Sequence, residues 1–364
     1  MRGILSRYLI SNFIKSFLVV FLCFFIVIML LESMEVVRKY FSAGYSPSMT
    51  QIIKITFCRA MVSFSSFFAF MILLSSIVFF TNFHNKLELI VIKGSGISPF
   101  QIFKSIAIAV AILGTFYISV FDSLSAYSYK QYHKTNTILK QGKDFETNMT
   151  ITNKGIWLKD TFDKKSYIIA ARGFSQKTSS LFNVRIFEFN ESNDYIRLIR
   201  AKNLGISDGN WSAKECVIIT ANGLRSGENS VNLPTKISYK NLSSMVADPR
   251  EISFWSIGKY INMFSKVGLS TIGYKIHWYS RISIILQMFA FAVVAMTFCV
   301  NQNLRDRKAY MIKVAILMAL AFPVYFLNNI VMAYGESGVL PIAFSAFAVP
   351  ILIFVTGILF LKKK

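Results

Sequence analysis

The sequence predicts an α-helical integral membrane protein with six transmembrane helices and an external all-β, jelly-roll-like domain inserted between helices 3 and 4. Three observations lead to this prediction. Of the 364 residues, 54% are hydrophobic and 16% are charged, which is too apolar for a soluble protein of this size. Six stretches lack charged residues and histidine over lengths close to the roughly 20 residues of a membrane-spanning helix. A polar block with short β-branched segments separates the third stretch from the fourth.

The six uncharged stretches are interpreted as the transmembrane helices. They are residues 16–31, 60–83, 105–121, 282–304, 314–335 and 337–361. The first and third are the shortest, and Lys15 and Lys104 extend them because the apolar stem of a lysine can lie at membrane depth while its amine reaches the interface. No small-residue cleavage site follows the first stretch, so we expect it to stay as an anchor.

The basic residues of the short segments predict the orientation, because such residues gather on the cytoplasmic side of a membrane. One side has thirteen, at Arg2, Arg7, Lys15, Lys86, Lys93, Lys104, Arg305, Arg307, Lys308, Lys313, Lys362, Lys363 and Lys364. The other side has four, at Arg38, Lys39, Lys54 and Arg59. Both termini are therefore expected in the cytoplasm, with the long block outside it. The formal net charge of +22 is divided across the membrane, which fits anionic lipid and argues against nucleic acid.

The polar block, residues 122–281, carries a strand pattern of its own. Turn clusters separate five runs rich in β-branched and aromatic residues: GIWLKD from 155, KSYIIAARGF from 165, LFNVRIFEFN from 181, YIRLIRAKNLGI from 195 and KECVIITANGL from 214. Phe182, Val184 and Ile186 alternate with polar residues, which predicts one buried face. This spacing indicates an antiparallel sandwich or an open jelly roll. Residues 250–275 return to helical periodicity.

Three parts of the chain follow from this pattern. Residues 1–124 hold transmembrane helices 1–3, residues 125–275 form the β-jelly-roll domain, and residues 276–364 hold helices 4–6. Of the four cysteines, only Cys216 lies in the β domain, so we expect no disulfide within it.

The sequence offers neither a catalytic nor a metal site. It contains no G-x-x-x-x-G-K-[ST] phosphate loop, so ATP hydrolysis by this chain is not expected. His84, His133 and His277 lie far apart on different segments, which argues against a metal site, and no cofactor is expected. The uncharged stretches also lack the carboxylates that proton-coupled transporters place at membrane depth. We therefore expect a non-catalytic protein whose energy source is another polypeptide.

The segment NKLELIVIKGSGISP at 85–99, between the second and third predicted helices, differs from an ordinary loop. Leu87, Ile90 and Val91 recur at helical spacing and predict a short amphipathic helix at 85–93, with Glu88 on another face. Such a helix can lie on the lipid surface or dock a cytoplasmic protein. The physical chemistry of these residues favours neither alternative.

Residues that end and start helices follow this run. Gly94 and Gly96 can take positive φ and stop the short helix. The sequence SPFQ from residue 98 fits a capping box, with Ser98 as N-cap, proline at N1 and Gln101 at N3. The third transmembrane helix is therefore expected to start afresh at this point.

The same segment resembles the coupling helix of lipopolysaccharide-export permeases, the LptF/LptG family of ABC transporter membrane subunits. Glu88, Lys93, Gly96 and Ser98 match the family pattern E-L-x-x-x-[RK]-x-x-G-[IVF]-[ST]. Further segments are similar to family motifs in the same order: GIWLKD with SYIIAARG, YINMFSKVGLSTIGYKIHWYSRI, NQNLRDR and MAYGESGVLPIAFSAFAVP. The segment ESMEVVRKYFSAGYS resembles LptG more than LptF. The loop CVNQNLRDR departs from the family pattern because it lacks Gly and Pro.

The resemblance implies a permease subunit that extracts lipopolysaccharide from the bacterial inner membrane and passes it to a periplasmic bridge. It also implies three protein partners: a cytoplasmic LptB-type ATPase dimer, a second six-helix permease of the LptF type and a single-helix LptC-type protein. The coupling helix would dock in the ATPase, with Glu88, Lys93, Gly96 and Ser98 as the coupling residues. The β domain would be periplasmic and would carry acyl chains in an apolar groove.

Basic residues at the external membrane edge are candidates for holding the phosphates of this cargo. Arg38 and Lys39 follow the first helix and can form charge-assisted hydrogen bonds with phosphate, and Lys130 and Lys134 are further candidates. The alternative is that they only meet lipid headgroups. For the whole chain, the alternatives are an ABC-linked mechanotransmitter, a membrane-anchored scaffold and a secondary transporter. The absence of carboxylates from the membrane stretches argues against a secondary transporter.

Overall fold

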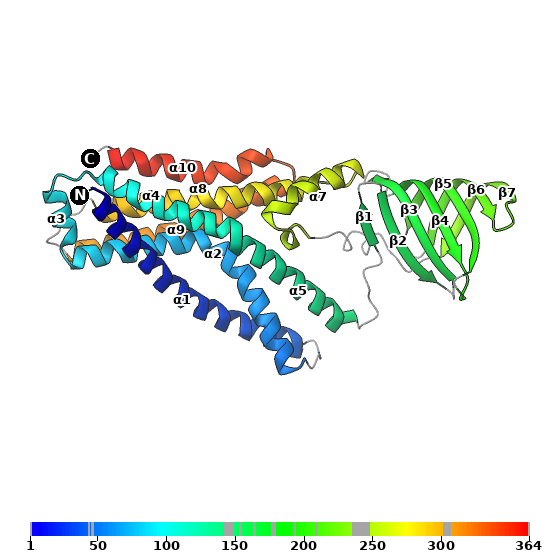
Figure 1. Ribbon diagram of the computed structural model, residues 1–364, viewed down its shortest axis with the longest axis horizontal. Coiled ribbons are helices and arrows are strands. Elements are labelled where there is room, and N and C mark those ends of the chain that lie inside the picture. Colours follow the sequence, from blue (N-terminus) through cyan, green and yellow to red (C-terminus); the bar gives the residue numbers. More distant parts are fainter. Residues whose placement is uncertain are drawn as a thin grey trace. The chain divides into compact units, whose positions relative to one another are not determined.

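The computed structural model describes most of the chain, in two compact units (Figure 1). The described residues are 2–42, 44, 47–141, 149–152, 155–162, 165–175, 180–192, 194–207, 210–234, 248–300 and 307–362. One unit, called the membrane unit below, comprises Met1–Lys140, Arg250–Phe254 and Lys275–Lys364. The other, called the β unit, comprises Gln141–Pro249 and Trp255–Tyr274.

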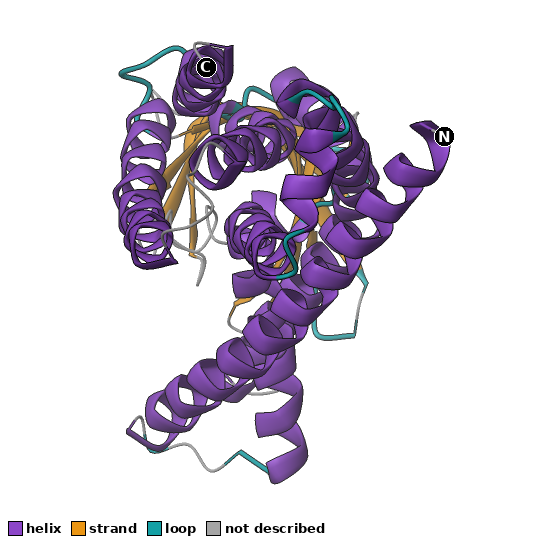
Figure 2. Ribbon diagram, turned by 90° about the vertical axis from the view of Figure 1, so that its left-hand side faces the viewer, coloured by secondary structure: helices purple, strands orange, loops and turns teal. Residues whose placement is uncertain are grey.

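Long helices build the membrane unit. In chain order the helices of the protein are α1 (Arg2–Ser42), α2 (Met49–Asn85), α3 (Glu88–Gly94), α4 (Pro99–Phe116), the π-helix η1 (Tyr117–Phe121), α5 (Asp122–Gln141), the 3-10 helix η2 (Pro249–Glu251), α7 (Phe254–Lys266), α8 (Ile272–Val300), α9 (Arg307–Glu336) and α10 (Ile342–Lys362). Figure 1 shows α1 and α2 side by side, and Figure 2 shows the helix that carries the N-terminus crossing the others obliquely.

Six helical segments among the described residues are long and apolar enough to cross a membrane. They are Gly3–Ser42, Met49–Asn85, Pro99–Asn136, Ile272–Phe298, Tyr310–Glu336 and Ile342–Leu361. Each coincides with one of the predicted stretches, so the prediction of six transmembrane helices is confirmed. The helices extend beyond the uncharged stretches at several ends. Charged residues that border a stretch in the sequence therefore lie inside helices in the structure.

The third membrane segment is one continuous helical path with a π-turn inside it. α4 passes through η1 directly into α5, which continues to Gln141. Ser98 caps the start of α4, where its side chain accepts a hydrogen bond from the backbone N–H of Gln101. The domain boundary proposed at 124/125 falls within α5, and the membrane unit reaches residue 140.

Phenylalanine side chains fill much of the core between the membrane helices. Phe13, Phe64, Phe68, Phe79 and Phe80 are at most 1% exposed. Their rings meet at tilted or edge-on angles, as between Phe13 and Phe79, whose centroids lie 5.7 Å apart. Aromatic rings favour such offset and edge-to-face arrangements, which add to the stabilisation from area burial.

The β unit contains a seven-stranded antiparallel sheet in which the strands follow chain order. The strands are β1 (Met149–Thr152), β2 (Gly155–Phe162), β3 (Lys165–Ser175), β4 (Ser180–Phe189), β5 (Tyr195–Ser207), β6 (Asn210–Thr220) and β7 (Arg225–Pro234). The prediction of an inserted all-β domain is confirmed. Among the described residues its strands form one meandering sheet, where the sequence pattern allowed a sandwich of two.

One face of the sheet is apolar and buried along successive cross-strand rows. One row places Leu158, Ile169, Ile186, Ile199 and Ile218 directly opposite one another on β2 to β6. These five side chains are at most 5% exposed. Because side chains on a strand alternate between faces, this row requires the period-two pattern of all five strands to be in register.

The alternation predicted for β4 holds at two of its three residues. Val184 and Ile186 are buried, but Phe182 is 38% exposed. Asn183, between Phe182 and Val184, has a φ of 55°. This value lies in the left-handed region and interrupts the extended backbone. Phe182 instead lies against Gly173 of β3, where a Cβ atom would come within 2.2 Å of its ring.

The segment after α7 packs onto the sheet. The backbone N–H of Phe174 donates to the carbonyl of Val267 at 2.8 Å, and Val267 is 1% exposed within the apolar core of the β unit. Gly268 follows with a φ of 79°, and a Cβ atom there would lie 2.6 Å from the carbonyl oxygen of Phe174. Glycine is therefore required for this close approach.

Candidate functional site

The short helix α3 lies between the end of α2 and the start of α4. The amphipathic helix was predicted at 85–93, whereas α2 continues to Asn85 and α3 begins at Glu88. The reason is Leu87, whose φ of 59° turns the chain between the two helices. Leu87 is therefore in the turn and not on the predicted helix face. Gly96, with a φ of 74°, makes the second turn that precedes α4.

Glu88 is fixed against the first helix. Both of its carboxylate oxygens accept from the hydroxyl of Tyr8 on α1, at 3.2 and 3.1 Å. The ring of Tyr8 in turn lies 5.9 Å from that of Phe83 on α2. The sequence placed Glu88 on a separate helix face but gave no partner for it, because Tyr8 lies 80 residues away in the chain.

Contacts around α3 link four membrane helices at this end of the unit. His84 of α2 stacks on Tyr310 of α9 at 4.4 Å, and the hydroxyls of Tyr310 and Thr81 lie 2.9 Å apart. Ser6 of α1 and Ser105 of α4 share a hydrogen bond of 2.6 Å. A displacement of α3 is thereby connected to α1 through the side chain of Glu88, and to α2 and α4 through the turns on either side of α3.

The remaining coupling candidates lie on either side of the turn after α3. Lys93 belongs to α3, but its side chain lies outside the described residues. The hydroxyl of Ser98 accepts from the backbone N–H of Gln101 at 3.3 Å, which is the N-cap that the sequence predicts. On the surface of α3, Val91 is 69% exposed. Single exposed apolar side chains are normal at a protein surface, so Val91 by itself marks no partner.

At the far end of α1, the structure brings one of the cargo candidates against α5. The amine of Lys39 donates to the hydroxyl of Tyr132 at 2.9 Å, and the hydroxyl of Tyr40 donates to Asn136 at 3.0 Å. Arg38, Lys130 and Lys134 are exposed side chains of the same two helices, α1 and α5. The four candidates thus lie on two helices that are tied together, although they form no single contact cluster.

An ion-pair network beside these lysines was missed by sequence reasoning. Arg59 of α2 pairs with Glu32 and Glu35 of α1, each at 2.6 Å, and Ser63 donates a further hydrogen bond to Glu32. The guanidinium also lies 5.6 Å from the ring of Tyr132. Glu32 and Glu35 are three residues apart on one helix face, and that spacing just beyond an uncharged stretch was the available signal.

A second charged pair lies deeper in the membrane unit. Asp122 of α5 and Arg281 of α8 approach to 2.9 Å between Oδ1 and Nε, with 1% and 12% of their side chains exposed. Asp122 directly follows the third uncharged stretch and Arg281 directly precedes the fourth. Sequence reasoning gave no role to either residue; the structure buries Asp122 and leaves Arg281 only slightly exposed.

The buried face of the sheet ends in a polar row. Asp160, Tyr167, Glu188, Arg197 and Thr220 lie opposite one another across β2 to β6. Glu188, 1% exposed, accepts from Lys165 at 2.9 Å and from Arg197 at 2.6 Å. Burial by itself would raise the pKa of Glu188, but these two hydrogen-bonded cations hold that pKa below its ordinary value. The hydrogen bond to Glu188 raises the pKa of Lys165.

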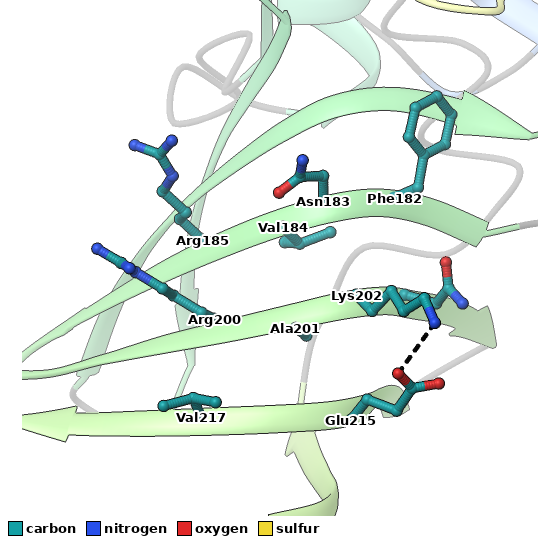
Figure 3. Close-up of a pocket in the computed structure, with 10 residues that line it drawn as sticks. Phe182, Asn183, Val184, Arg185, Arg200, Ala201, Lys202, Glu215 and Val217 are labelled. Atoms are coloured by element: carbon teal, nitrogen blue, oxygen red, sulfur yellow. Dashed lines mark hydrogen bonds and ion pairs between the residues drawn. The ribbon is translucent and has the colours of Figure 1, made fainter. Parts of the chain in front are cut away.

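The opposite face of the sheet has a shallow basic hollow of about 700 Å³ (Figure 3). Arg185 of β4 and Arg200 of β5 are directly opposite each other there. Beside them, Lys202 pairs with Glu215 at 3.1 Å, and both of these side chains are largely exposed. Like charges directly opposite on neighbouring strands are destabilising, so this row costs the sheet some stability.

The histidines do not gather in the structure. His133 lies 3.4 Å from Glu251, His277 lies 3.4 Å from Arg281, and His84 stacks on Tyr310 as described above. Within the described residues, no three histidine, cysteine or carboxylate side chains come together to hold a metal ion.

The comparison with protein families identifies the family of the chain. A family model described as lipopolysaccharide export system permease LptF/LptG matches residues 7–363. No curated protein matches the chain. The match covers both the membrane helices and the inserted sheet, and it does not separate LptG from LptF. The chain therefore belongs to the LptF/LptG family of lipopolysaccharide export permeases, the membrane subunits of an ABC transporter.

Proposed function

We propose that this chain extracts lipopolysaccharide from the bacterial inner membrane and hands it to a periplasmic bridge, using the work of a separate ATPase. The observation that carries this proposal is α3, a short helix between two membrane helices whose Glu88 is tied to α1 through Tyr8. A force on α3 acts on α1 through this contact and on α2 through the chain. This is the arrangement that a membrane subunit without its own nucleotide site requires.

The ATPase partner in this proposal is a cytoplasmic dimer of the LptB type. It would receive α3 with the exposed side chain of Val91 as an apolar contact, and Glu88, Lys93, Gly96 and Ser98 would shape the docking segment. A second permease of the LptF type and a single-helix LptC-type protein would complete the assembly. Both termini of this chain would then be cytoplasmic and the β unit periplasmic, as the distribution of basic residues favours.

The cargo would meet two different surfaces. Its phosphates would bind near Arg38 and Lys39, with Lys130 and Lys134 as further contacts, because cations at a membrane edge form charge-assisted hydrogen bonds with phosphate. Its acyl chains would pass along an apolar groove of the β unit, as the family resemblance implies. Leu158, Ile169 and Ile186 are already covered within this chain, so they belong to the core of that unit and not to its open surface. An apolar groove suits acyl chains because their transfer from water is favourable.

The alternative is a mechanotransmitter that relays ATPase strokes to the β unit and moves no lipid itself. The short helix α3 suits this alternative equally well. The family match to a lipopolysaccharide export permease favours the first proposal over a mechanotransmitter.

Co-purification tests the assembly. The tagged chain is extracted from its native membrane in mild detergent, and co-eluting proteins are identified by mass spectrometry. We expect an ABC-type ATPase and a second six-helix permease. Recovery of the chain alone, or with periplasmic proteins only, would contradict the proposal.

The coupling role of Glu88 has a separate test. Glu88→Ala removes both contacts to Tyr8, so we expect loss of ATP-driven transport while the chain stays inserted in the membrane. The matched control is Glu215→Ala, because Glu215 is an exposed carboxylate of the β unit with one lysine partner. Normal transport by the Glu88→Ala variant would refute the coupling role of Glu88.

A further inference from the structure

A buried polar cluster joins three membrane helices around Arg281 of α8. Its Nη1 donates to the hydroxyl of Tyr117 at 2.7 Å and to that of Ser65 on α2 at 3.0 Å. Its Nε lies 2.9 Å from Oδ1 of Asp122, although these two atoms lack the alignment of a hydrogen bond. Ser65, Tyr117 and Asp122 are at most 2% exposed. The guanidinium is thus surrounded by partners from α2, η1 and α5.

The second carboxylate oxygen of Asp122 has a different partner. It accepts from the backbone N–H of Phe254 at 2.7 Å, across 132 residues of sequence. Phe254 is the first residue of α7, so its N–H is one of the donors that a helix cannot satisfy internally. Asp122 therefore caps α7 from another segment, while Arg281 balances its charge.

The backbone just before Asp122 is unusual. Residues Tyr117–Phe121 form a π-helical turn between α4 and α5. π-turns are rare in proteins, and many of those that occur lie at functional sites. An ordinary α-helical turn at this place would rotate the following residues by about 100°, one residue's share of a 3.6-residue turn. Asp122 would then no longer face Arg281 and Phe254, so the direction of its side chain depends on η1.

We propose that Asp122 is a positioning residue of the transport cycle, whose carboxylate holds the start of α7 on the third membrane helix. The guanidinium of Arg281, 2.9 Å away, keeps the carboxylate in place. Movement of the third helix during the cycle then reaches the start of α7, whose residues after Phe254 belong to the β unit. This inference rests on the proposed function and adds the link that carries motion towards that unit.

The alternative explanation is a purely structural ion pair. A buried pair is costly to break, because removing one partner leaves the other charge uncompensated. Loss of activity after a single charge change would therefore not separate the two explanations. The distinguishing feature is the hydrogen bond to Phe254, which a structural pair between α5 and α8 does not need.

Two substitutions of Phe254 isolate this hydrogen bond. Phe254→Ala removes the ring and keeps the N–H, whereas Phe254→Pro also removes the N–H. Proline is tolerated at the first position of a helix, so α7 can still start. In the purified, reconstituted assembly, we expect the alanine variant to transport lipopolysaccharide normally. We expect the proline variant to lose about tenfold or more, the factor for a lost charge-assisted hydrogen bond. ATP hydrolysis and subunit recovery are expected to stay normal in both.

A second pair of variants decides the matter if the proline variant fails to assemble. Asp122→Asn with Arg281→Gln removes both charges and keeps an oxygen that accepts from Phe254. Asp122→Ala with Arg281→Gln removes both charges and the acceptor. We expect transport by the first double variant and its loss in the second. Lys202→Ala, at an exposed ion pair of the β unit, controls for general effects of removing a charge.

The results separate three possibilities. Equal transport by the alanine and proline variants of Phe254, or by the two double variants, would overturn the positioning role of Asp122. Transport by the alanine variant but not the proline variant, with normal ATP hydrolysis, supports it. Failure of the unmodified assembly to transport lipopolysaccharide would instead refute the proposed function, and with it the premise of this inference.

Discussion

Four basic residues near the far end of α1 are candidates for cargo binding, and their environments differ. Lys39 is half-buried and donates to Tyr132, whereas Arg38 is exposed. Arg38→Glu together with Lys39→Glu reverses two charges, and Lys39→Glu also removes the donor to Tyr132. We expect weaker lipopolysaccharide binding, measured by photo-crosslinking of the cargo to the purified assembly. A decrease of about tenfold would correspond to ~1.4 kcal/mol of lost binding free energy.

The control for this charge reversal is Lys202→Glu, an exposed lysine on the β unit. Salt dependence adds a second check, because contacts between exposed charges weaken as ionic strength rises. Unchanged crosslinking in the double variant at low salt would refute the assignment of Arg38 and Lys39 to the cargo phosphates.

Glu188 predicts a pH dependence for the stability of the β unit. Lys165 and Arg197 hold its pKa below the ordinary 4.5, so its pairing stabilises the folded state above that pH. This contribution is lost as the pH falls through the folded-state pKa. We expect Glu188→Gln to lower the melting temperature at pH 7 and to flatten the loss of stability below about pH 4.5. If the variant and the native protein have the same melting temperature at every pH from 3 to 7, the pairing of Glu188 with Lys165 and Arg197 contributes nothing to stability.

At the scale of elements, the end of α7 depends on one glycine. Gly268 and Gly223 have almost the same φ, 79° and 80°, but only Gly268 faces a backbone oxygen at close range. Gly268→Ala therefore meets both backbone strain and a clash with Phe174, whereas Gly223→Ala meets the strain alone. We expect Gly268→Ala to destabilise the β unit beyond the ~1–3 kcal/mol expected for strain, measured by denaturant unfolding. Equal effects of the two substitutions would contradict the role given to this contact.

Local sequence patterns predicted helices correctly where a single feature, such as an uncharged stretch or an N-cap, determines where the helix lies. The uncharged stretches located six helices, and the SPFQ run located the start of α4 at Ser98. Where backbone conformation departs from the regular pattern, prediction failed. Leu87 and Asn183 adopt positive φ, which moved the start of α3 and exposed Phe182. Leucine rarely adopts positive φ, so nothing marked Leu87 in advance. Asparagine adopts it more readily, so Asn183 carried a signal that the alternation pattern overrode.

At the scale of the whole molecule, the partners of charged side chains were beyond prediction. Glu88 meets Tyr8, Arg59 meets Glu32, and Asp122 meets Phe254, in each case across 27 or more residues of sequence. A single sequence shows which residues are charged and where helices begin. It does not show which helices are neighbours, because many packings satisfy the same apolar faces.

We propose that this chain moves lipopolysaccharide with energy supplied by a partner ATPase. The most direct measurement is ATP-driven release of lipopolysaccharide from vesicles that contain the purified assembly, followed with a labelled cargo. We expect release that requires ATP, and we expect release to be lost when the Glu88→Ala variant replaces the native subunit in an intact assembly. Release that proceeds equally without ATP, or no release from a complete and ATP-hydrolysing assembly, would contradict it.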